Sequence, residues 1–119
     1  MDPFASALEQ AAAVRHGEVA SRELVDLYLA RVERLNPELN HYVLITSDVA
    51  HQMADAAAGG KGELAGAPCS IKDLISLAGY PTTLGSRPFK ELLLPFDGFA
   101  VAQLKQAGTP ILAPAVKGR

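Results

Sequence analysis

The stretch that most constrains this chain is residues 64–87, LAGAPCSIKDLISLAGYPTTLGSR, in which a short strand precedes a long loop. The strand can begin only after Pro68, because proline removes a backbone donor, and it ends near Asp73. Side chains alternate along a strand, so Ser70 and Lys72 are expected on the same face. The sequence thus predicts a lysine at the carboxyl end of a strand, where open α/β sheets commonly bind ligands.

A helix and a second strand follow this loop. The loop, about residues 74–96, is long for a compact domain, and such length usually indicates a functional segment. After Asp97, apolar residues recur at helical spacing up to Gly108, and residues 109–112 predict a short strand with an unpaired edge. Strand, helix and strand in this order form a crossover unit, which implies a parallel pair of strands.

The residues before this stretch predict helices. The first is expected over residues 3–16, with Asp2 as its cap. Ser21 is expected to cap a second, amphipathic helix, which the Asn36-Pro37 pair should end. This part of the chain is therefore interpreted as support for the strand and loop that follow.

A further strand and helix complete the expected elements. Residues 41–46 are rich in β-forming side chains, and Ser47 or Asp48 can cap the alanine-rich helix that follows. We therefore interpret residues 1–119 as one domain, in which residues 1–60 are mainly helical and residues 61–119 form the strand, loop, helix and strand. The fold class is α/β.

Composition narrows the class of protein. A chain of 119 residues has room for one small domain, and 49% hydrophobic with 20% charged residues is typical of a globular one. The formal charge is -2, so no basic surface is expected to bind nucleic acid. Only 6% of the residues are aromatic and none is tryptophan, which disfavours stacking on bases.

Residues that respond to the cellular compartment or bind metals are few. A single cysteine cannot form an internal disulfide, which fits a reducing compartment. No run approaches the roughly 20 apolar residues of a membrane span, so a cytoplasmic protein without membrane contact is expected. His16, His41 and His51 lack the spacing of metal ligands, so no metal site is expected.

The central stretch resembles the first conserved block of the amidase signature family. Members of that family carry a strand ending in Lys-Asp and then a Gly-x-x-Thr-Thr-x-Gly-Ser loop. The matching residues here are Lys72, Asp73, Gly79, Thr82, Thr83, Gly85 and Ser86. The flanks, SRELVDLYLARVERLNPELNHYV and DGFAVAQLKQAGTPIL, are also similar, so the resemblance covers about residues 5–112. It implies an incomplete amidase-signature fold, in which amino-terminal helices pack on a small parallel or mixed sheet.

The resemblance also implies a function. The complete protein would hydrolyse a carbon–nitrogen bond of a small carboxamide, without a cofactor, and Lys72 corresponds to the base of the family's Ser-cisSer-Lys triad. The site-lining residues are expected to be Thr82, Thr83, Gly85 and Ser86. The two triad serines belong to a later glycine- and serine-rich stretch that this sequence does not contain. The chain is thus expected to be an amino-terminal piece that is inactive alone.

Several alternatives stay open. Some family members are instead the amidase component of glutamyl-tRNA amidotransferase, which releases ammonia from glutamine, and the sequence does not separate the two activities or give the oligomeric state. The Thr-Thr-x-Gly-Ser residues also suit a plain turn, and Lys72 can act as a base only if burial keeps it neutral. A rival interpretation is a non-catalytic interaction module or subunit that uses its helices and sheet edge to bind another chain.

Overall fold

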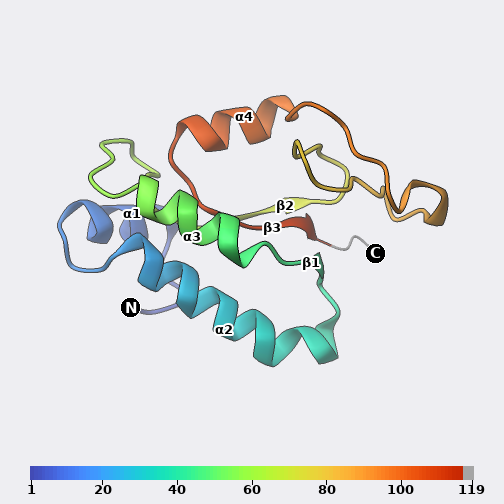
Figure 1. Cartoon of the computed structure of the whole chain (residues 1–119). Helices are drawn as coiled ribbons and strands as arrows, with labels where there is room; N and C mark the ends of the chain where they lie inside the picture. Colours follow the sequence, from blue (N-terminus) through green and yellow to red (C-terminus); the bar gives the residue numbers. More distant parts are fainter. Residues whose placement is uncertain (117–119) are drawn as a thin grey trace.

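The structure, a computed structural model, describes residues 1–116. Within them, helices lie on both sides of a small sheet (Figure 1). The elements are, in order, α1 (Ala7–Arg15), α2 (Ser21–Leu39), β1 (Tyr42–Leu44), α3 (Ser47–Ala56), β2 (Cys69–Lys72), the short 3-10 helix η1 (Arg87–Phe89), α4 (Phe99–Gln106) and β3 (Ile111–Val116). No helix of this described part combines the length and apolar character needed to cross a membrane.

The sheet is mixed and has the strand order β1-β3-β2. β2 and β3 are parallel, with Cys69 opposite Ile111 and Lys72 opposite Val116, so the predicted crossover through α4 is confirmed. β1 pairs with β3 in the antiparallel sense. The expectation that the last strand leaves an unpaired edge is therefore wrong, because β3 has a neighbour on each side and β1 and β2 form the edges.

Two apolar clusters hold the helices against the sheet. α4 covers one face, and α2 and α3 lie on the other (Figure 1). The neighbours Ile111 and Leu112 of β3 belong to different clusters because side chains alternate along a strand. The cluster on the α4 side contains the buried residues Ile71, Leu77, Val101 and Ile111. The opposite cluster contains Val25, Ala50, Ala54 and Leu112.

Helix α1 begins later than the sequence pattern predicts. Ser6 is its N-cap, and its Oγ accepts a hydrogen bond of 3.2 Å from the backbone N–H of Glu9. The Glu9 carboxylate accepts a bond of 2.7 Å from the N–H of Ser6 in return. This reciprocal capping box satisfies two donors at the helix end, whereas a start at Pro3 with Asp2 as the cap satisfies fewer. The predicted start at residue 3 is therefore wrong.

Ser21 is not the cap of α2 but its first residue, and Ala20 takes the cap position. The buried Ser21 hydroxyl instead donates a hydrogen bond of 2.8 Å to the carbonyl of Gly66. Gly66 has φ +86°, and a Cβ atom there would lie 2.8 Å from Val14 Cγ1. Only glycine allows this close approach, which fixes the start of α2 beside the segment leading into β2.

Helix α2 also runs past the point where the sequence predicts its end. It continues through Pro37 to Leu39, and Asn40 follows in the left-handed conformation with φ 47°. The Asn36 side chain accepts bonds of 2.9 and 2.8 Å from the N–H groups of residues 41 and 42. Asn36 thus connects the end of the helix to the start of β1, and this connection offsets the backbone bond that proline removes.

Helix α3 begins at Ser47, but neither predicted capping residue caps it. Its N-cap is Thr46, which makes no side-chain capping bond. The Thr46 backbone N–H instead donates to the carbonyl of Leu112 at 3.1 Å. The start of α3 is therefore fixed by its link to β3 rather than by a local cap.

Candidate functional site

Lys72 is the last residue of β2 and lies opposite Val116 of β3, at the carboxyl end of the parallel pair. Its side chain is exposed. Among the residues that the structure describes, no carboxylate forms an ion pair with it. The lysine is thus presented to the surroundings of the sheet edge rather than held by the chain itself.

Ser70 and Lys72 project from the face of β2 opposite to Ile71. Ile71 is 3% exposed and belongs to the cluster under α4, so its two neighbours point the other way. The Ser70 hydroxyl lies 3.1 Å from the hydroxyl of Tyr42 in β1. Ser70 is therefore occupied by a tyrosine, and the structure gives it no hydrogen bond to Lys72 among the described residues.

Asp73 follows the lysine and turns into the protein. It is 6% exposed, and its Oδ1 accepts a hydrogen bond of 2.7 Å from the backbone N–H of Thr83. Its Oδ2 accepts a second bond from the Thr83 hydroxyl. No role for Asp73 was predicted from the sequence. Its position directly after an exposed strand residue was the available signal, because the alternation of side chains directs it to the buried side.

Residues 83–86 form a tight turn. The N–H of Ser86 donates to the carbonyl of Thr83 at 2.9 Å, and the two central residues, Leu84 and Gly85, have φ values of 54° and 70°. These are the features of a turn with two left-handed central residues, which glycine adopts easily and leucine does not. The predicted site residues Thr83, Gly85 and Ser86 are therefore brought together in one turn.

Thr82 lies just before this turn and is 4% exposed. Its N–H donates to the carbonyl of Leu92 at 2.9 Å, so the loop folds back on itself. At the end of the loop, Asp97 accepts bonds of 2.8 Å from the N–H of Ala78 and from Lys105 Nζ. The bond from Lys105, and then that from Ala78, hold the pKa of Asp97 below its ordinary value. The loop is thus fastened at two carboxylates.

Cys69, at the start of β2, is half-buried, and this burial raises the pKa of its thiol. Its Sγ donates to Thr109 Oγ1 at 3.6 Å. A desolvated thiol of this kind is a poor nucleophile. The described residues also contain no group of three histidine, cysteine or acidic side chains arranged to hold a metal ion.

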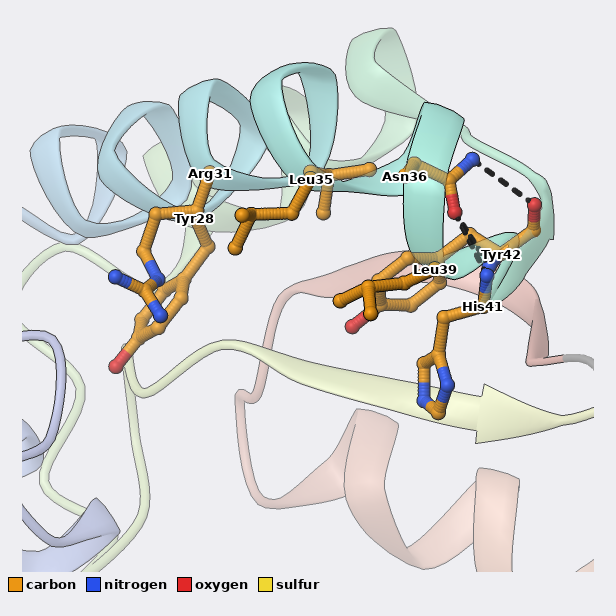
Figure 2. Close-up of a pocket in the computed structure, with 8 residues that line it drawn as sticks. Tyr28, Arg31, Leu35, Asn36, Leu39, His41 and Tyr42 are labelled. Atoms are coloured by element: carbon orange, nitrogen blue, oxygen red, sulfur yellow. Dashed lines mark hydrogen bonds between the residues drawn. The ribbon is translucent and has the colours of Figure 1, made fainter.

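An open groove of about 180 Å³ lies beside the sheet, away from Lys72 and the turn (Figure 2). Its walls include Tyr28, Arg31 and Leu35 of α2, together with His41 and Tyr42. None of the residues predicted for the site lines it. Tyr42 is the link, since the same side chain borders the groove and contacts Ser70 of β2.

Comparison with known proteins places this arrangement in context. The family model described as Amidase matches residues 23–116. The chain is 39% identical over 112 residues to the A-type subunit of glutamyl-tRNA(Gln) amidotransferase from Halorhodospira halophila, a match that covers 90% of the chain and 23% of that protein. It is 41% identical over 101 residues to the same subunit of a Synechococcus species, covering 80% of the chain and 21% of that protein. The chain thus spans less than a quarter of the length of these relatives.

Solved structures show the same relation. A 6-aminohexanoate cyclic dimer hydrolase complexed with substrate superposes with a TM-score of 0.87 at 28% identity, over 96% of this chain and 24% of that one. The peptide amidase of Stenotrophomonas maltophilia gives a TM-score of 0.86 at 26% identity, over 96% of this chain and 25% of that one. The fold of this chain therefore corresponds to about a quarter of each of these larger chains.

Proposed function

Because the chain belongs to the amidase signature family, we propose that it supplies the general base, Lys72, of an enzyme that hydrolyses the carbon–nitrogen bond of carboxamides. The observation that supports this most is the position of Lys72. It closes β2 at the carboxyl end of a parallel pair, and the next residue, Asp73, holds the turn at residues 83–86. A base and a substrate-lining turn are thereby joined at one end of the sheet.

In the proposed reaction, neutral Lys72 accepts a proton, through a bridging serine, from the hydroxyl of a nucleophilic serine. The serine oxygen attacks the carbonyl carbon, and the carbon–nitrogen bond breaks with protonation of the leaving nitrogen. Water then hydrolyses the acyl-enzyme and releases a carboxylate. Thr82, Thr83, Gly85 and Ser86 line the substrate in this proposal, and no cofactor takes part.

The two serines lie outside the sequence printed above. We propose that they come from polypeptide that packs against the carboxyl end of β2 and β3, and we call this chain together with that polypeptide the complete enzyme. The pairing of Lys72 with Val116 supports this, because chain that continues from β3 leaves the sheet beside the lysine. Such packing also covers the exposed Lys72 side chain, and removal from water favours the neutral form of a lysine.

A second candidate function has its own support. The curated relatives at 39% and 41% identity are subunits of glutamyl-tRNA(Gln) amidotransferase, whereas the hydrolases of known structure are 26–28% identical. In that case the carboxamide is the side chain of glutamine. Rates of ammonia release from glutamine and of aniline release from an anilide, measured on the complete enzyme, distinguish the two substrates.

The isolated chain tests whether the serines must come from elsewhere. We expect no release of aniline or ammonia above buffer, because acyl transfer needs a nucleophile and oxyanion donors as well as a base. Lys72→Ala is the matched control. Multiple turnovers that disappear in this variant would reveal a nucleophile within the chain, and Ser70 would be the first residue to replace. A stable stoichiometric complex with another chain, but no turnover in that complex, would favour the non-catalytic module.

A further inference from the structure

A buried carboxylate lies directly beside the proposed base. Asp73 is 6% exposed, and a charged group at such a site is costly unless donors satisfy it. The two donors that the structure gives it, a backbone N–H and a hydroxyl, both belong to Thr83, ten residues further along the chain. The carboxylate therefore fastens the strand end to one specific point of the loop.

The contact extends into the turn. Thr83 Oγ1, which donates to Asp73, also accepts a hydrogen bond of 3.3 Å from the N–H of Gly85. The chain of bonds thus runs from Asp73 through Thr83 to Gly85. Leu84, between them, has φ 54°, a conformation that costs a residue with a side chain on the order of 1 kcal/mol and persists only where its surroundings impose it.

We propose that Asp73 is a positioning residue for the proposed reaction. Through Thr83, its carboxylate sets where the turn at residues 83–86 lies relative to Lys72. Lys72 and Asp73 are adjacent, so a displacement of the turn from Asp73 is a displacement from the base. This inference rests on the proposed function for its catalytic consequence, but the contact itself can be tested without any activity.

The other fastening of the loop provides a matched control. Asp97 is also an aspartate that accepts one backbone N–H and one side-chain donor, but its partners are Ala78 and Lys105. It holds the base of the loop and makes no contact with the turn. Asp97→Asn therefore makes the same chemical change as Asp73→Asn without removing the link to Thr83.

The first test measures hydrogen exchange of the turn amides in the 119-residue chain. Hydrogen bonds to a charged group are strong, so Thr83→Val and Asp73→Asn should raise the exchange rates at residues 83 and 85 about ten- to hundredfold. Thr83→Ser keeps the hydroxyl and should stay within about threefold of the wild-type rate. Asp97→Asn should leave these two amides unchanged. Equal rates in Thr83→Val and Thr83→Ser would overturn the proposed contact.

The second test measures kcat and KM in the complete enzyme. Thr83→Val should lower kcat/KM at least about tenfold, Thr83→Ser should restore it, and the pH dependence of kcat should keep its shape because the base is unchanged. Faster exchange at residues 83 and 85 with unaltered kcat and KM would make Asp73 merely structural and overturn the inference. A loss in Thr83→Val without any loss in Lys72→Ala would instead contradict the proposed function and leave the contact standing.

Discussion

The hydroxyl groups of Tyr42 and Ser70 lie 3.1 Å apart although β3 runs between their two strands. Adjacent strands are about 4.8 Å apart, so the tyrosine side chain spans about 9.6 Å of the sheet. It does so on the face from which Lys72 also projects. The two edge strands are therefore linked across the central one, and the groove beside α2 is connected to the strand that carries the proposed base.

Removal of this link should destabilise the sheet by a modest amount. Tyr42→Phe and Ser70→Ala each remove one hydroxyl, and each should lower the free energy of unfolding by about 0.5–1.5 kcal/mol in a urea titration. The double variant should cost less than the sum of the two, because either change alone already breaks the bond. Strictly additive costs would show that the two hydroxyl groups do not interact.

The Asp97 contacts predict a dependence of stability on pH. Its pKa in the folded chain is below the ordinary value of 3.8, chiefly because of Lys105, so the unfolded chain takes up the proton first as the pH falls. The contribution of Asp97 is therefore complete above that ordinary value and is lost as the pH falls through the lowered one. The free energy of unfolding should fall less steeply below about pH 4 in Asp97→Asn than in the wild type. Parallel pH profiles would contradict this.

The capping box of α1 gives a local prediction. Ser6→Ala removes the side-chain acceptor for Glu9 and should cost about 0.5–2 kcal/mol of stability. Ser47→Ala is the matched control, because Ser47 is the first residue of α3 and not its cap. Its cost should be within about 0.5 kcal/mol, as for other surface changes. Similar thermal midpoints for wild type and Ser6→Ala would refute the assigned cap.

The burial of Cys69 predicts a slow thiol. Desolvation raises its pKa, so little thiolate is present near neutral pH and a disulfide reagent reaches the sulfur poorly. The folded chain should react with such a reagent at least about tenfold more slowly than the chain in denaturant, since a raised pKa and limited access act together. Equal rates in the two states would show that the strand start is open to solvent.

The sequence predicted those parts of the fold that depend on neighbouring residues. The crossover from β2 through α4 to β3 follows from strand, helix and strand signals within residues 69–116. The pairing of β1 with β3 brings together Tyr42 and Val116, which are far apart in sequence, and no local pattern signals that contact. The start of α1 was ambiguous, because two capping residues were available and only the reciprocal bond to Glu9 favours the later one.

The site was predictable to a similar extent. Pattern and resemblance put Lys72 at a strand end and drew attention to the threonine and glycine loop, and the structure has the lysine at that end. The link between Asp73 and Thr83 could not be foreseen, because it depends on how a long loop returns to the strand. The roles of these residues in catalysis stay predictions.

The central claim, that Lys72 is the general base, is tested most directly by turnover of an anilide and of glutamine in the complete enzyme with Lys72→Ala and Lys72→Arg. A general base commonly contributes about 10²- to 10⁴-fold, so kcat should fall by at least about a hundredfold in Lys72→Ala while the fold is kept. Lys72→Arg should be equally slow, because arginine stays protonated and accepts no proton. Turnover within about tenfold of the wild type in either variant would contradict the assignment of Lys72 as the base.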